Sequence, residues 1–471
     1  MLAIAAMVGC GGGDMLTGAG GSSGRGGGGG DAGGPPGTGG TGALGGSGET
    51  GGVAGMGVGG MRGVGGAAGS GGQSGGSTGT AGSGGTVVGP FGNNVDILMM
   101  IDDSSSMTEM QQKLSAQLPT FVLALQSLPT PPSLHLAVVS SDLGAPGDST
   151  ASIMCTAQGD QGDFHSMPEG TCASTTLQAG ATFISDVNMV PNYTDPSLGA
   201  VVQCIALLGD KGCGFEHQLA SIDRALGADG LGPVPSPNVG FLRPNAYLVI
   251  LILTNEDDCS APQNTTIYSL NGLMQNISNP DGPIANYRCN GGPRGGHLCQ
   301  DPNAANKTAY LTPPLAPPSD AQGTSTTPIL ELDNCEDNES GTSALTPVSK
   351  FVADIKALKP DPDNQIVVAS IAAPATPYGV VWLPEQGGQN TKPGELWPEV
   401  MHSCGPAAGA DVNPAVIQST TDESFGDPAV RITQFTGAFP ISVLGSICDA
   451  SFAATMNAIA TKIGLLIAPA P

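Results

Sequence analysis

The chain has 471 residues, 74 of which are Gly, and a formal net charge of −25 at pH 7. Because so acidic a chain repels phosphate backbones and anionic lipid surfaces, its charge argues against nucleic acid as a partner. Glycine is concentrated between residues 11 and 90, where most other residues are Ser, Thr and Ala. A segment with so little apolar surface to bury is expected to be a disordered tether for the rest of the chain.

The first ten residues, MLAIAAMVGC, form a short apolar run that ends in Gly9-Cys10. A small residue directly before a cysteine, at the end of such a run, resembles the bacterial lipobox. We therefore predict a signal segment and lipobox at residues 1–10, and acylation of Cys10. No later segment reaches about 18 uninterrupted apolar residues, so the lipid is the only expected membrane contact. The predicted location is the bacterial cell envelope, at the outer membrane or cell surface.

Residues 91–471 contain apolar runs typical of buried strands and apolar residues at helical spacing. Strands are predicted at 95–101, 134–140, 246–253 and 365–371, and helices at 107–128, 197–208, 216–226, 348–358 and 452–467. Alternating strands and helices predict one α/β domain with a doubly wound, mostly parallel sheet. The polar, turn-rich segments at about 144–196 and 260–347 are expected to be disulfide-rich insertions.

An even number of cysteines follows Cys10, dispersed over the predicted domain: Cys155, Cys172, Cys204, Cys213, Cys259, Cys289, Cys299, Cys335, Cys404 and Cys448. In an exported protein this pattern predicts disulfides, and none of these residues lies in a Cys-x-x-Cys pair. The sequence does not fix the pairing, although near neighbours such as Cys155–Cys172 and Cys204–Cys213 are natural guesses. The stretch from Cys289 to Cys299 contains His297, so zinc is an alternative there that an oxidising compartment disfavours.

Two of the strongest predicted strands end in oxygen-rich clusters. Asp102, Ser104 and Ser106 follow the first strand, and residues 255–258 (Asn-Glu-Asp-Asp) follow the strand at 246–253. In a doubly wound sheet, ligands bind beyond the carboxyl ends of the strands, where the strand order reverses. Hard oxygen donors suit Mg²⁺, Ca²⁺ or Mn²⁺. The alternative is that the serines only cap the next helix and the acids are solvated loop residues.

The strand VDILMMI, followed by Asp102-x-Ser104-x-Ser106, resembles the opening of a von Willebrand factor A (vWA) domain with its metal-ion-dependent adhesion site (MIDAS). The resemblance spans roughly residues 94–467, interrupted by the two insertions, and is greatest to the bacterial lipoprotein branch of the family. It implies that the Asp and both Ser hold a divalent cation. A Thr from a later loop and an Asp after the fourth strand would complete the protein's share. An acidic side chain of the partner would take the open coordination position.

The chain departs from the vWA pattern at two positions. The Asp expected after the strand at 246–253 falls at Asn255, which is neutral. The expected Thr has no clear counterpart, and Glu216 or His217 could substitute for it. Asp257 is a further candidate ligand in a rearranged site.

The predicted function is non-catalytic binding or adhesion outside the cell, with a divalent cation as cofactor and a protein or surface ligand as partner. One alternative is a metal-dependent hydrolase that uses the acids near Asp257. Another is a structural envelope lipoprotein with a degenerate metal site. Among the histidines, His135 is expected to be satisfied within its strand. His165 and His402 have no acid or nucleophile at a motif spacing.

Overall fold

The computed structural model describes residues 91–145, 155–167, 177–194, 197–268, 286–384, 396–405 and 425–468. The predicted signal segment, Cys10, the glycine-rich tether and Cys172 lie outside these residues. None of the helices in the described ranges is both long enough and apolar enough to cross a membrane.

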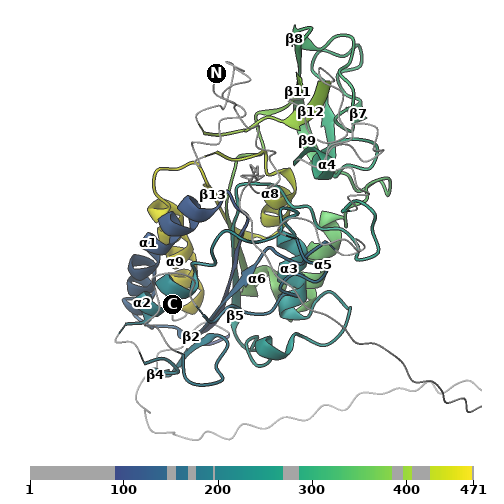
Figure 1. Ribbon diagram of the computed structural model, residues 1–471. Helices are drawn as coiled ribbons and strands as arrows, with labels where there is room; N and C mark the ends of the chain where they lie inside the picture. Colours follow the sequence, from purple (N-terminus) through teal and green to yellow (C-terminus); the bar gives the residue numbers. More distant parts are fainter. Residues whose placement is uncertain are drawn as a thin grey trace, which may run out of the picture. The chain divides into compact units, whose positions relative to one another are not determined.

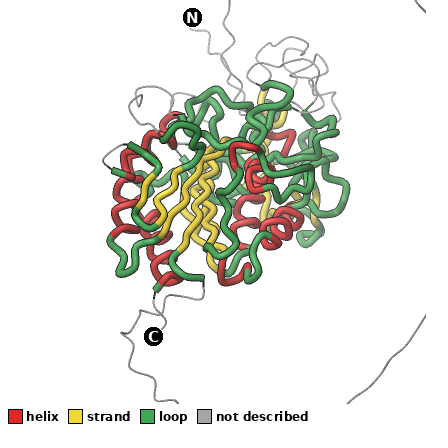
Figure 2. Tube along the Cα trace, turned by 90° about the horizontal axis from the view of Figure 1, so that it is seen from below, coloured by secondary structure: helices red, strands yellow, loops and turns green. Residues whose placement is uncertain are grey.

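A seven-stranded sheet in the order β13-β10-β5-β1-β2-β3-β4 forms the centre of the protein (Figures 1 and 2). The strands from β13 to β2 run parallel, and β3 and β4 add an antiparallel edge. Their bounds are β1 (Asn94–Ile101), β2 (Ser133–Ser140), β3 (Ile184–Val187), β4 (Val190–Pro191), β5 (Tyr247–Leu253), β10 (Ile366–Ala372) and β13 (Ile441–Ser446).

The central strands are apolar because helices cover both faces of the sheet (Figure 2). Along β1, Ile97 and Met99 face one apolar core, and Leu98 and Met100 face the other, as the two-residue period of a strand requires. The first core contains α1 (Thr108–Gln126), α2 (Leu198–Ile205) and α9 (Ala453–Ile467). The second contains α3 (Gln218–Leu226), α5 (Val348–Ala357) and α8 (Val430–Gly437). The short helices are η1 (Ser236–Asn238), α4 (Asn286–Asn290) and α6 (Pro362–Gln365).

A second, antiparallel sheet has the order β12-β11-β9-β6-β7, with β8 paired to β9. Its strands are β6 (His297–Gln300), β7 (Tyr310–Leu311), β8 (Gln322–Thr324), β9 (Thr327–Asp337), β11 (Tyr378–Pro384) and β12 (Leu396–Val400). Buried Trp382 and Leu330 belong to its apolar core. The segment that holds α5 and β10 separates β9 from β11 in the chain, so this sheet is assembled from two stretches of sequence (Figure 1).

The predicted fold class is confirmed, since the domain is α/β with a mostly parallel sheet and helices on both faces. The structure adds β13, α8 and the second sheet, none of which was predicted. The segment at 260–347 had been predicted only as a polar insertion. In fact it contributes β6, β7, β8 and β9, and β9 pairs with β11.

Disulfides join Cys155 to Cys213, Cys259 to Cys289, Cys299 to Cys335, and Cys404 to Cys448. Cys204 is disulfide-bonded as well. The prediction of disulfides is confirmed for these residues, but both guessed pairs are wrong, because the fold brings residue 213 against residue 155 across a separation of 58. The zinc alternative is also wrong, since Cys289 and Cys299 belong to different disulfides and His297 contacts Asp257.

Candidate functional site

The candidate site lies where the strand order of the main sheet reverses. The chain passes from β1 to β2 on one side and later returns to β5 on the other side of β1. The loops that follow β1 and β5 therefore diverge from one point at the carboxyl edge of the sheet, the usual position of ligands in this architecture. The backbone N–H of Asp102 donates to the carbonyl of Leu253 at 2.9 Å, which joins the two loops at their start.

Asp102 is completely buried and surrounded by uncharged donors. Its Oδ1 accepts hydrogen bonds from the backbone N–H of Ser104 at 2.9 Å and from Ser141 Oγ at 3.2 Å. Its Oδ2 accepts one from Thr254 Oγ1 at 2.8 Å. Burial raises the pKa of the Asp102 carboxyl, and the hydrogen bonds from Ser104 and Thr254 lower it in part.

The two serines of the predicted motif connect Asp102 to the loop after β5. Ser104 Oγ lies 3.4 Å from Ser106 Oγ, and Ser106 Oγ donates to Asn255 Oδ1 at 3.3 Å. Asn255 is completely buried, and its Nδ2 has no hydrogen-bond partner in the described part of the chain. The structure thus brings Asp102, both serines and Asn255 together. No side chain caps α1, whose N-cap is Met107, so the serines do not have the alternative role of helix caps.

Glu216 and Glu256 are buried beside these residues, with 1% and 3% of their surface exposed. They lie close enough for their side chains to interact with each other and for Glu216 to be repelled by Asp102. Burial raises the pKa of both carboxyls well above the usual range. Repulsion by Asp102 adds to this for Glu216, and repulsion by Glu216, Asp427 and Asp102 adds to it for Glu256. Glu216 was a predicted ligand. Glu256 was noted within the acidic run but not selected, because the run does not show which side chain turns towards Asp102.

We call Asp102, Asp103, Glu216 and Glu256 the Asp102 cluster. Burial raises the pKa of Asp103 as well, and repulsion by Asp142 and Asp102 adds to this. Within the residues that the structure describes, no Lys, Arg or His lies at ion-pair distance from any carboxyl of the cluster. Ionised carboxylates in such an environment need a cation or a proton.

The carboxylates of the Asp102 cluster, with the neighbouring hydroxyls of Ser104 and Ser106 and the Asn255 amide, form a set of oxygen donors that fits a hard divalent cation. In the described ranges, no three His, Cys, Asp or Glu side chains stand in the arrangement of a metal site. A cation bound here would therefore also draw on the hydroxyls of Ser104 and Ser106 and on the Asn255 amide.

Asp257 and Asp258 belong to a different group, which we call the Arg431 network, with His297, Asp337 and Arg431. Asp257 accepts hydrogen bonds from His297 Nε2 at 2.7 Å and from the backbone N–H groups of α8 at 2.9 and 3.1 Å. Asp258 pairs with Arg431 Nη2 at 3.0 Å, and Arg431 Nη1 also binds Asp337 at the end of β9. The predicted ligand Asp257 is thus engaged with the second sheet and α8, and its oxygens are used there.

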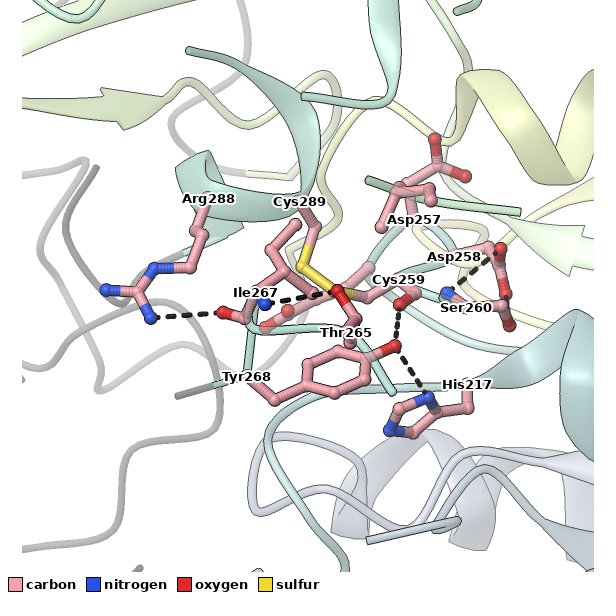
Figure 3. Close-up of a disulfide and its surroundings, with 12 residues drawn as sticks. His217, Asp257, Asp258, Cys259, Ser260, Thr265, Ile267, Tyr268, Arg288 and Cys289 are labelled. Carbon is pink, nitrogen blue, oxygen red and sulfur yellow. Dashed lines mark hydrogen bonds between the residues drawn. A yellow bond between two sulfur atoms is a disulfide. The ribbon is translucent and has the colours of Figure 1, made fainter. Parts of the chain in front are cut away.

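The other proposed substitute, His217, is held by Tyr268 (Figure 3). His217 Nδ1 lies 3.1 Å from the Tyr268 hydroxyl, and Nε2 lies 2.7 Å from the carbonyl of Gly144. The same hydroxyl also lies 2.6 Å from the carbonyl of Cys259, beside the disulfide to Cys289. Burial lowers the pKa of His217 to about 4, so the imidazole is neutral, and both of its nitrogens are occupied.

The remaining histidines have partners that only the fold reveals. His135 Nδ1 lies 2.7 Å from the Phe241 carbonyl, which confirms that it is satisfied in its strand. His165 Nε2 lies 3.1 Å from Asp160 Oδ2, and His402 Nδ1 lies 2.6 Å from Asp427 Oδ1. Neither pair has the spacing of a known motif, so the sequence did not single out these contacts.

No family model matches the chain, and no curated protein sequence is similar to it. Among solved structures, the vWF domain of the type V pili tip protein Mfa5 from Porphyromonas gingivalis is similar over 81% of this chain and 98% of that chain. Its TM-score is 0.31 and the sequence identity is 11%. The pilus adhesin SpaC from Lactobacillus rhamnosus GG, in an open conformation, is similar over 80% of this chain, with a TM-score of 0.27 and 10% identity. The similar region covers only 30% of the SpaC chain.

Proposed function

We propose that this chain is a non-catalytic binding protein of the cell surface, which captures a protein or surface ligand through a divalent cation at the carboxyl ends of β1 and β5. The observation that carries the proposal is the Asp102 cluster, whose buried carboxyls lie beside serine hydroxyls at the reversal of strand order and have no counter-ion among the described residues. The two proteins of similar structure are named as a pilus tip protein and a pilus adhesin.

A bound cation would supply Lewis acidity towards one oxygen ligand from outside the protein. Asp102 and Ser104 are completely buried, whereas Ser106 is partly exposed and marks the side from which a ligand can approach. A chain with a net charge of −25 repels an acidic ligand. The cation would convert that repulsion into a direct contact, so binding of an acidic side chain would depend on the cation.

The hydrolase alternative relied on the acids near Asp257. Asp257 accepts three hydrogen bonds, and Asp258 is paired with Arg431, so these carboxylates hold the fold together around α8. A general base needs a lone pair directed at the substrate. We therefore propose binding without turnover.

The cation dependence is tested by capture of envelope proteins on the immobilised full-length chain, in buffer with Mg²⁺ or with EDTA. We expect capture in Mg²⁺, loss in EDTA, and recovery when Mg²⁺ is restored. Asp102→Ala should lose capture, whereas Asp320→Ala, which removes an exposed acid, should not. Equal capture by all proteins in both buffers would overturn the proposal and favour a structural lipoprotein whose metal site is degenerate.

We further propose that the chain is anchored to the membrane by a lipid on Cys10, on the strength of the apolar run that ends in Gly9-Cys10. Labelling with a palmitate analogue in bacterial cells should modify the wild type and not Cys10→Ala. The substituted protein should move from the membrane fraction to the soluble fraction. An unlabelled wild type would contradict the anchor and leave the proposed binding site unaffected.

A further inference from the structure

We propose that Glu216 and Glu256 supply the negative charge with which this site holds its divalent cation, a charge that Asn255 does not provide. The inference rests on the proposed function and names the anionic ligands of the same site. The ion is of the hard, oxygen-binding class, such as Mg²⁺, Mn²⁺ or Ca²⁺.

The burial of the two glutamates is the first observation. Each is more than nine-tenths buried, each lies close to the other, and Glu216 lies close to Asp102. Buried charges are normally paired or coordinate a metal. Asp257 and Asp258, only one and two residues beyond Glu256, follow this rule through His297 and Arg431. Asp257 and Asp258 thus have partners within the protein, whereas no Lys, Arg or His of the described ranges lies at ion-pair distance from Glu216 or Glu256.

Three unpartnered atoms form the second observation. Glu216 Oε1, Asn255 Nδ2 and Gln218 Oε1 are buried and make no hydrogen bond within the described ranges. Gln218 belongs to the same group, since its Nε2 donates to Thr254 Oγ1 at 2.9 Å, and that hydroxyl donates to Asp102. The large majority of buried side-chain polar atoms have partners, and the two oxygens among these exceptions, Glu216 Oε1 and Gln218 Oε1, are acceptors that a cation can bind.

The chemistry of the site favours a metal ion over an organic cation. The neutral oxygens of the site, which contact one another, come from Ser104, Ser106 and the Asn255 amide, and these are ligands of hard divalent cations. Because Glu216 Oε1 makes no hydrogen bond, the carboxyl can turn towards an ion without breaking one at that oxygen. Two carboxylates would offset the charge of a divalent ion, which neutral serine and asparagine oxygens cannot do.

The test is direct cation binding to the full-length protein, without any adhesion ligand, by calorimetric titration with Mg²⁺ and by the electron paramagnetic resonance signal of Mn²⁺. We compare the wild type with Glu216→Gln, Glu256→Gln and the double variant. Asp223→Asn is the matched control, because it makes the same carboxyl-to-amide change at another buried acid, on α3, that is associated with Asp354 instead. Thermal unfolding of each variant shows that it is folded and whether Mg²⁺ raises its melting temperature.

We expect each single variant to weaken cation binding at least about tenfold and the double variant to lose both binding and the melting-temperature shift. The control should bind as the wild type does. Wild-type affinity in both glutamate variants would overturn the inference while leaving cation-dependent capture intact. If the glutamate variants lose the cation but capture by the wild type is indifferent to EDTA, the ligands are correct and the proposed function is wrong. A wild type that binds neither ion would overturn the inference.

Discussion

Two groups of buried acids, each with a member in the loop after β5, differ in how their charge is balanced. In the Arg431 network, Asp258 and Asp337 pair with one guanidinium, and Asp257 accepts three hydrogen bonds. In the Asp102 cluster, the donors are hydroxyls and amides, and two glutamates lie together. The comparison shows that two adjacent acids of one loop, Glu256 and Asp257, can belong to groups with different roles. A network that contains its own cation stabilises the fold, whereas a cluster that lacks one is suited to bind an external cation.

The largest effect is expected from Arg431→Met, which removes the cation of the Arg431 network. Asp258 and Asp337 would remain buried without a counter-ion, so we expect a loss of about 3–5 kcal/mol in the free energy of unfolding. Urea denaturation measures it. Arg224→Met is the control, since Arg224 is partly exposed and its ion pair with Asp229, at 3.5 Å, should contribute less than about 1 kcal/mol. Equal effects of the two substitutions would show that the network is not a main source of stability.

The next effect concerns the disulfide between Cys259, which directly follows Asp258 in the chain, and Cys289 (Figure 3). Replacement of both Cys259 and Cys289 by Ala opens a loop with a sequence separation of 30. We expect the free energy of unfolding to fall by about 2–4 kcal/mol, because the unfolded chain gains freedom. Mg²⁺ affinity should be kept, because the hydrogen bonds of Asp102 do not involve either cysteine. A lost affinity would show that the disulfide positions the Asp102 cluster as well.

A third buried acid, Asp223, belongs to neither group and permits a test of how stability depends on pH. Burial, with the nearby carboxyl of Asp354, raises the pKa of Asp223 to about 9 from an ordinary value of 3.8. The folded state therefore retains a proton that the unfolded state releases, and the contribution to stability falls as pH rises between these values. Asp223→Asn cannot ionise and should be more stable than the wild type at pH 8, by about 1–3 kcal/mol. Urea denaturation should show this gain shrinking towards pH 4, and a gain independent of pH would contradict the assigned cause.

The smallest effect is expected from Asn255→Asp, which adds the carboxylate that the vWA pattern places there. Ser106 Oγ can still donate to the new side chain, and the added charge should tighten Mg²⁺ binding by about 1 kcal/mol. The gain is small because Glu216 and Glu256 already provide negative charge. Calorimetric titration checks it. A larger gain in Mg²⁺ affinity in the Glu216→Gln background than in the wild type would show that the carboxylates at positions 216 and 255 can replace each other as sources of charge. An equal gain in both backgrounds would argue against this exchange.

The strands of the main sheet that could be predicted from the sequence are those that are buried along most or all of their length. β1 and β5 are buried along their whole length, so their apolar runs are continuous. β13 was missed because it is an edge strand of intermediate exposure with the sequence ISVLGS, in which serine and glycine interrupt the pattern. β9 and β11 depend on pairing between stretches far apart in the chain, and neither the pairing nor the register is encoded in a local pattern.

The part of the candidate site that could be predicted from the sequence is the part whose residues lie close together in the chain. Asp102, Ser104 and Ser106 lie in one turn after a buried strand, so their convergence follows from the strand end itself. The choice between Glu256 and Asp257 could not be made in this way, because beyond the strand the direction of each side chain depends on the path of the loop. That path is fixed by distant contacts, among them the α8 N–H groups that bind Asp257.

The second sheet has a consequence for the order in which the protein assembles. β9 must pair with β11, but the chain between them first forms α5 and β10, and β10 is inserted between β5 and β13. During synthesis, β9 leaves the ribosome before its partner β11 exists, and contacts between distant residues are slow to form. The second sheet therefore cannot be excised as a self-folding module or grafted onto another scaffold. A fragment from 286 to 405 would carry β10 as an unpaired apolar strand, prone to aggregate.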